Sequence, residues 1–402
     1  MKGFDRRSPR ARGSWSLVVL TSLLVLSDST FVWALGPLVP ALVDDYQLSS
    51  SQVGNLVAAY LVGGMIVTLP AITLMRRRGV REASLWGLLV SAAACAAFGF
   101  ADQYGTLFAA RLVHGAGALA VFMAAMAWVV ESSDRLNRGR LIGLVLGVSG
   151  MGAVFGPAIG GLVLVVGRPI AFLVASFYLL ALAGATSLFP DQPIRYPGKL
   201  RTAFSARAVR ASLYMVIAPS GLMGALMSIS PLHLSAAGAG GATIAGSFIV
   251  AAIVGIPARP MFGRWSDRRG RYPAISGGLL VFGLCAAAFG LADSTWAAFV
   301  TAALAVATLG LVWAPSFALV ADACEDIRAG QIEASAITAL AWGAPAVLGA
   351  SGAGFLAEVI GTQRAMMCIA AFAASSAVAV KVAARSDGGQ AISGAAGSTG
   401  TT

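Results

Sequence analysis

Long, uninterrupted apolar stretches alternate with short polar connections along almost the whole chain. Twelve of them are long enough to cross a membrane, because a helix needs about 20 apolar residues to span the hydrocarbon layer. They comprise residues 15–42, 52–75, 83–101, 104–130, 141–166, 169–189, 211–233, 241–258, 273–292, 294–321, 334–357 and 365–384. Strands of a membrane β-barrel are excluded, since these stretches show no alternation of apolar and polar positions. The pattern predicts an all-α integral membrane protein with twelve transmembrane helices.

Composition and charge support a membrane protein. Hydrophobic residues make up 58% of the chain and charged residues only 11%, whereas about 25% of residues in a soluble domain are charged. The net charge of +11 could indicate a nucleic-acid partner, but the basic residues lie in alternate connections. All but three of the 28 Lys and Arg residues fall on one side, the exceptions being Arg111, Arg168 and Arg364. The positive-inside rule makes that side cytoplasmic, with both termini on it, and the simplest location is the inner (plasma) membrane.

The chain contains two similar halves. The connection RRRGVR at 76–81 has a counterpart in DRRGRY at 267–272, and the longest connection, 190–210, divides the twelve stretches six and six. We therefore predict two pseudo-symmetric six-helix bundles at 15–189 and 211–384, with the substrate path between them. Residues 1–14 form a cytoplasmic segment, 190–210 a cytoplasmic linker, and the Gly/Ser-rich residues 385–402 a disordered cytoplasmic tail.

Four stretches resemble motifs of the major facilitator superfamily: LSDSTFVWALGP (26–37), ARLVHGAGA (110–118), GMGAVFGPAIGGLV (150–163) and GRWSDRRGRY (263–272). Together they cover both halves of the chain. The resemblance implies the twelve-helix major facilitator fold and, through the first and third stretches, the drug or metabolite:proton antiporter branch. It also implies a secondary transporter that works by alternating access.

The stretch at 263–272 is similar to the family's loop signature, which in that family latches the outward-open state. The residues that match are Gly263, Asp267, Arg268, Gly270 and Arg271. The first-half copy, ITLMRRRGVR, departs from the signature because Ile72 replaces the leading glycine and Arg76 replaces the acid. Whether this altered loop still gates stays open.

The stretch at 150–163 is similar to the family's antiporter motif in the fifth helix. Gly152, Gly156 and Gly160 fall on one helix face, which permits close approach of a neighbouring helix. Pro157 removes the hydrogen bond to the carbonyl of Ala153 and permits a bend, and Gly161 completes the motif. The resemblance implies export by antiport.

Asp28 is the one acid inside a predicted span, and Arg111 is a cation inside another. An unpaired charge in lipid is expensive, so each group should face a cavity or a partner. Asp28 lies about 20 Å from the inner face and Arg111 about 10 Å from the outer face at 1.5 Å per residue, which gives them similar depths in a core of about 30 Å. We predict that they approach each other, with His114 one turn deeper. Asp28 would then bind the coupling proton, Arg111 would tune its proton affinity, and His114 could relay the proton.

The second half carries no charge within its predicted spans before Lys381, because the eighth span is predicted to end at residue 258 and Arg259 to belong to an inner connection. Its part of the cavity should therefore be apolar and neutral-polar, which suits a mainly apolar substrate. The cavity candidates from both halves are Thr30, Trp33, Met223, Met227, Trp313 and Trp342.

No enzyme constellation is present in the sequence. There is no phosphate-binding Gly-x-x-x-x-Gly-Lys-Ser/Thr loop, and neither the two histidines nor the four cysteines form a metal-binding cluster. We predict no catalytic residue, cofactor, metal or nucleic-acid partner; a small-molecule substrate, protons and the lipid bilayer are the expected partners, and oligomerisation is not required. The predicted function is proton-coupled export of small, mainly apolar organic compounds. Uptake or uncoupled facilitation of a small metabolite is an alternative, and a non-transporting membrane sensor is an alternative of another class.

Overall fold

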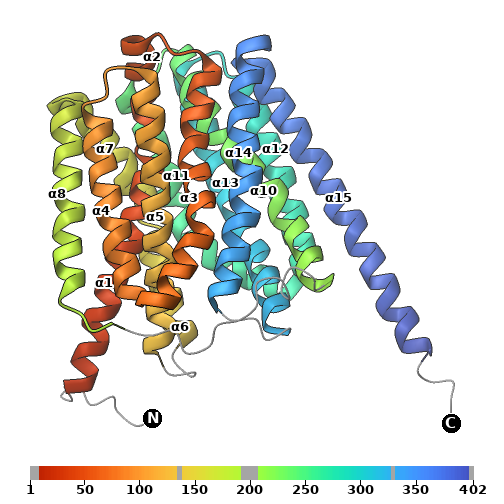
Figure 1. Cartoon of the computed structure of the whole chain (residues 1–402). Coiled ribbons are helices and arrows are strands. Elements are labelled where there is room, and N and C mark those ends of the chain that lie inside the picture. Colours follow the sequence, from red (N-terminus) through yellow and green to blue (C-terminus); the bar gives the residue numbers. More distant parts are fainter. Residues whose placement is uncertain (1–8, 134–137, 192–206, 327–330, 398–402) are drawn as a thin grey trace.

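The computed structural model describes residues 9–133, 138–191, 207–326 and 331–397, and these residues form a helical bundle (Figure 1). Most of the predicted linker at 190–210, together with the first eight residues of the predicted N-terminal segment, lies outside the described residues. Both ends of the described chain, Pro9 and Gly397, lie at one face of the bundle, here called the terminal face. The other end of the bundle is called the opposite face.

The first half contains eight α-helices and one 3₁₀ helix among its described residues. They are α1 (Pro9–Trp33), η1 (Gly36–Leu38), α2 (Val39–Tyr46), α3 (Ser50–Arg78), α4 (Val80–Gly99), α5 (Tyr104–Ser132), α6 (Arg138–Ser149), α7 (Gly152–Val166) and α8 (Arg168–Ser187). The second half contains α10 (Arg207–Ala236), α11 (Gly241–Arg269), α12 (Arg271–Gly290), α13 (Thr295–Asp326), α14 (Gln331–Ile360) and α15 (Thr362–Gly397).

Twelve segments of the described chain are long and apolar enough to cross a membrane, which confirms the predicted number. The first of them, Trp15–Tyr46, is not one helix, because α1 ends at Trp33 and the chain continues through η1 into α2. Pro37 and Pro40 explain the interruption, since a proline has no N–H to donate and its ring displaces the preceding turn. The fifth segment is likewise broken between α6 and α7.

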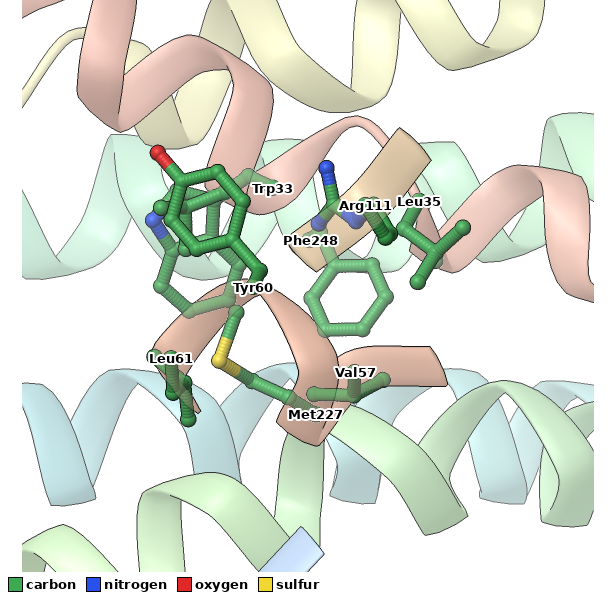
Figure 2. A pocket seen from close by; sticks show the side chains of 10 residues that line it. Trp33, Leu35, Val57, Tyr60, Leu61, Arg111, Met227 and Phe248 are labelled. Carbon is green, nitrogen blue, oxygen red and sulfur yellow. The ribbon is translucent and has the colours of Figure 1, made fainter. Parts of the chain in front are cut away.

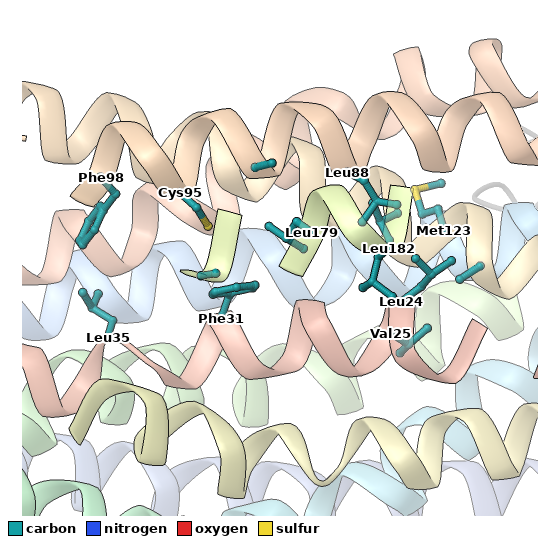
Figure 3. Close-up of a cluster of buried hydrophobic side chains, with 14 of the residues drawn as sticks. Leu24, Val25, Phe31, Leu35, Leu88, Cys95, Phe98, Met123, Leu179 and Leu182 are labelled. Carbon is teal, nitrogen blue, oxygen red and sulfur yellow. The ribbon is translucent and has the colours of Figure 1, made fainter. Parts of the chain in front are cut away.

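Apolar side chains are both buried between helices and exposed around the outside. One buried cluster joins helices of the first half, with Leu24, Leu88 and Leu179 at its centre (Figure 3), and a second cluster joins helices of the second half around Phe282 and Phe289. Large apolar residues are also exposed on the surface, for example Leu348 and Trp296. Exposed apolar surface of this extent is what a lipid environment permits and water does not.

The two halves pack tightly against each other near the opposite face. Gly54 of α3 lies against Ala350 and Gly354 of α14, so closely that a Cβ at Gly54 would overlap the carbonyl oxygen of Ala350. One turn closer to the opposite face, a carboxylate oxygen of Glu358 on α14 accepts a hydrogen bond from the backbone N–H of Ser51 (3.0 Å). The two halves are therefore in direct contact near the opposite face.

The last helix departs from the sequence-based expectation. α15 continues to Gly397 and slants away from the other helices (Figure 1), whereas the tail was predicted to be disordered from residue 385. Alanines at 391, 395 and 396 favour continuation of the helix, whereas Gly388, Gly389 and Gly394 oppose it, so the local sequence does not account for the extension.

Candidate functional site

Asp28 and Arg111 meet through a third side chain, Tyr60. The hydroxyl of Tyr60 on α3 donates a hydrogen bond to Oδ1 of Asp28 on α1, at 2.6 Å. The guanidinium of Arg111 on α5 lies over the ring of the same tyrosine, 4.6 Å from its centroid. Among the described residues no ion pair within 4.0 Å joins Asp28 to a cation, so the predicted approach of Asp28 and Arg111 takes the form of a shared aromatic neighbour.

Arg111 is held by the end of helix α1. Its Nη1 donates a hydrogen bond to the backbone carbonyl of Phe31 at 3.2 Å. That carbonyl is available because α1 ends at Trp33, which leaves the carbonyls of its last turn without partners in the helix. The side chain is only 6% exposed, and its Nε has no hydrogen-bond partner. A cation in such surroundings is stabilised by the face of the Tyr60 ring.

His114 lies one turn along α5 from Arg111 and is buried. Its ring packs edge-on against the rings of Phe31 and Tyr60, with centroid distances of 4.9 and 5.4 Å. The polar atom close to it is Sγ of Cys95, 3.8 Å from Nε2. His114 therefore touches the same tyrosine as Asp28 and Arg111, but no hydrogen bond joins it to Asp28 among the described residues.

A small cavity of about 20 Å³, enough for about one water molecule, lies beside this cluster between the two halves (Figure 2). Both halves contribute to its wall, and Arg111 is the charged residue in the lining. The lining residues are Val32, Trp33, Leu35, Gly36, Val57, Tyr60, Leu61, Arg111, Met227 and Phe248. The rings of Trp33 and Phe248, one from each half, pack at a centroid distance of 5.8 Å.

Two of the predicted cavity candidates, Trp33 and Met227, line this cavity, and four do not. The hydroxyl of Thr30 is bonded to the carbonyl of Leu26 in its own helix, and Met223 is buried in the second-half cluster. Trp313 and Trp342 pack against each other at 6.5 Å. Tyr60 and Phe248 were missed, because an aromatic residue in an apolar run carries no sign in the sequence of the face it occupies.

Arg259 is a second residue that sequence reasoning missed. It was assigned to an inner connection, but α11 continues to Arg269 and the membrane-crossing segment includes Arg259. The helix passes through both Pro257 and Pro260 without ending. The second half therefore does carry a charge within a span.

The glycine stripe of α7 faces α1. A Cβ at Gly152 would overlap Ser29, one at Gly156 would overlap the carbonyl of Thr30, and one at Gly160 would overlap the carbonyl of Ala34. Pro157 lies inside α7, and the break between α6 and α7 lies just before Gly152. Gly161 does not face α1: a Cβ added there would lie 3.9 Å from the side chain of Ala245 on α11. The motif thus lets α7 lie directly against the helix that carries Asp28.

The two similar connections at the terminal face both turn at a glycine with positive φ, Gly79 (+93°) and Gly270 (+96°). The second-half acid, Asp267, is exposed, as are Arg268 and its neighbours, and no hydrogen bond or ion pair of Asp267 is found in the described part of the chain. Gly263 lies within α11 and Arg271 begins α12.

The first-half connection has Arg76 in place of the acid of the signature, but a carboxylate reaches this connection from the segment that follows α8. Oδ1 of Asp191, which follows α8, accepts a hydrogen bond from the backbone N–H of Arg81 at 3.0 Å. Nη1 of Arg81 in turn donates to the carbonyl of Phe189 at 3.3 Å. Asp191 therefore supplies negative charge to the first turn of α4, where the helix dipole favours it.

Comparison with known proteins gives a consistent result. The family model described as Major Facilitator Superfamily matches residues 21–350 and 258–397. The chain is 28% identical over 174 residues to "Multidrug resistance protein 2" of Bacillus subtilis, an alignment that covers 42% of the chain and 43% of that relative. It is 26% identical over 261 residues to "Uncharacterized MFS-type transporter YcaD" of Escherichia coli, covering 63% and 67%. A "Probable vesicular acetylcholine transporter-B" of Danio rerio is 29% identical over 185 residues, covering 44% and 37%. The alignments thus span less than half the length of the first and third of these relatives.

Proposed function

The chain belongs to the major facilitator superfamily, whose members are membrane transporters and not enzymes, and from that premise we propose that it exports small, mainly apolar organic compounds in exchange for protons. The observation that carries the proposal is the cluster of Asp28, Tyr60 and Arg111 beside a cavity shared by both halves. The Asp28 carboxylate, partly buried and held by one hydroxyl, is the group to which we assign the coupling proton.

The coupling follows from the position of Asp28. Its carboxylate is bonded to Tyr60, and Tyr60 itself lines the cavity. A substrate that enters the cavity touches the tyrosine that holds both Asp28 and Arg111, so substrate binding and protonation of Asp28 act on one network. His114 packs against Tyr60 and is the candidate for passing the proton on.

Alternating access requires that the two halves open at one face while they close at the other. We propose that the packing of α3 on α14 closes the opposite face. The exposed Asp267 agrees with this state, because the loop it belongs to would act as a latch when the other face opens. We propose that the terminal face is cytoplasmic in the inner (plasma) membrane, as the distribution of Lys and Arg favours.

The substrate class and the direction rest on two further observations. The cavity wall is apolar and aromatic apart from Tyr60 and Arg111, which suits a mainly apolar molecule. The glycine stripe of α7 lies against α1, so the antiporter-type motif contacts the helix that carries Asp28. The name of the Bacillus subtilis relative is in keeping with export. Substrate-driven proton flux in vesicles, compared between the wild type and Asp28→Asn, tests the proposal.

A further inference from the structure

Arg259 lies inside the membrane-crossing part of α11. About ten residues separate it from the end of the helix, which places its Cα about 15 Å from the terminal-face end at 1.5 Å per residue. The side chain is half-buried. An arginine at this depth is rare unless it serves binding or transport.

The guanidinium lies between the two halves. Its Nη1 is 3.5 Å from the Cβ position of Gly150, at the junction of α6 and α7 in the first half. Its Nη2 is 3.3 Å from the Cβ position of Gly310 on α13 in the second half. Two glycines thus leave room for the planar head of Arg259 at the boundary where a transported molecule must pass.

This cation has no counter-charge in the described part of the chain. No ion pair within 4.0 Å reaches Arg259, and its Nε is buried without a hydrogen-bond partner. Arg111 adds a second positive charge to the interior, whereas the Asp28 carboxylate is bonded to Tyr60. A desolvated guanidinium without an acid is costly, and a bound anion would remove the cost.

We propose that Arg259 binds an acidic group of the transported molecule, so that the substrate is an amphipathic organic anion. Its apolar body would lie against Trp33 and Phe248, and its carboxylate-like group would reach Arg259. Phe248 precedes Arg259 on α11 by about 16 Å along the axis, and side chains on a helix lean toward its N-terminus. An aryl group with a short acidic chain would span the distance that remains between the Phe248 ring and the guanidinium of Arg259.

This assignment rests on the proposed export function and agrees with its energetics. With one anion on Arg259 and an ionised Asp28, the two negative charges balance those of Arg111 and Arg259. The substrate-loaded protein then changes from the inward-facing to the outward-facing state with Asp28 deprotonated, as exchange of substrate for a proton requires. An outward-moving anion and an inward-moving proton are both favoured by an inside-negative potential.

The test uses three probes that differ in charge and little in size: naphthylbutyrate, naphthylbutyramide and naphthylbutylammonium. Equilibrium binding to the purified full-length protein is measured for each without any gradient. We expect the anion to bind at least about tenfold more tightly than the amide, as for a charge-assisted hydrogen bond, and the cation to bind most weakly. Arg259→Gln should abolish the preference for the anion, and Arg259→Lys should retain part of it.

Arg264→Gln is the matched control, because Arg264 lies on the same helix and is exposed. It should leave all three affinities unchanged. Equal affinities of the anion and the amide, tighter binding of the cation, or no binding of the anion to the wild type would overturn the proposal. These binding measurements do not depend on proton coupling. A missing anion preference would therefore overturn the assignment of Arg259, whereas unchanged proton flux in Asp28→Asn vesicles would contradict the proposed export function.

Discussion

The Tyr60 hydroxyl donates to the Asp28 carboxylate at 2.6 Å, while the ring of the same tyrosine carries the Arg111 guanidinium on its face. Tyr60 of α3 therefore joins the acid of α1, Asp28, to the cation of α5, Arg111. Since Tyr60 also lines the cavity, any movement of α3 that opens or closes the path changes the surroundings of both charges. This link gives a structural reason for coupling without a direct ion pair.

Replacement of Tyr60 separates its two contacts. Tyr60→Phe removes the hydrogen bond to Asp28 and keeps the ring under Arg111, whereas Tyr60→Leu removes both. We expect coupled transport to fall about tenfold in Tyr60→Phe, as for one hydrogen bond to a charged group, and further in Tyr60→Leu. Initial rates of substrate-driven proton flux, normalised to folded protein, measure both. Equal rates in Tyr60→Phe and the wild type would mean that the hydroxyl is not used.

The glycine stripe of α7 predicts a stability difference between two neighbouring motif positions. Gly156→Ala forces a Cβ into the carbonyl of Thr30, whereas Gly161→Ala meets its nearest neighbour at 3.9 Å. Overpacking of this kind costs about 1–3 kcal/mol, so the first variant should unfold several degrees lower in detergent and the second should match the wild type. Thermal unfolding of the three proteins decides, and indistinguishable midpoints would mean that α7 does not lie against α1 as described.

We expect the contact between Glu358 and Ser51 to control how easily the opposite face opens. The carboxylate of Glu358 accepts from the N–H of Ser51 in the first turn of α3, where the positive end of the helix dipole adds to the attraction. Glu358→Gln should weaken this contact between the halves and raise exposure of the cavity. The exposure is measured with Val57→Cys, which places a cysteine in the buried cavity lining. The rate at which a membrane-impermeant maleimide labels this cysteine reports how accessible the cavity is.

The labelling should be several-fold faster in the Glu358→Gln background, with the modification read at position 57 by mass spectrometry. Asp45→Asn is the control, because Asp45 is an exposed acid of α2 at the same face. Equal labelling in all backgrounds would show that the Glu358 contact does not hold this face closed.

The fold was largely predictable because lipid imposes one simple requirement, a continuous apolar stretch of sufficient length. The predicted spans begin and end within a few residues of the observed ones at 104–132 and 141–166. The interruption of the first span at Trp33 was not foreseen. Apolar length alone does not reveal where Pro37 and Pro40 end one helix and begin another.

The site was predictable only in part, because depth can be counted along a helix but rotation about its axis cannot. Asp28 and Arg111 were placed at similar depth, and they share a neighbour. Tyr60 stayed hidden because nothing in its apolar surroundings indicates a polar partner. Arg259 was assigned to a connection because the apolar run was predicted to end at residue 258. The helix nevertheless continues past Pro257 and Pro260 to Arg269, since neighbouring helices compensate for prolines in a membrane helix.

The most direct test of the central claim is proton movement in reconstituted vesicles that contain a pH-sensitive dye, recorded on addition of a panel of apolar organic compounds. The wild type and Asp28→Asn are compared at equal protein content, with Asp45→Asn as a surface control. The account predicts substrate-triggered proton flux in the wild type and in the control, and its loss in Asp28→Asn. Proton flux that persists unchanged in Asp28→Asn would contradict coupling at Asp28.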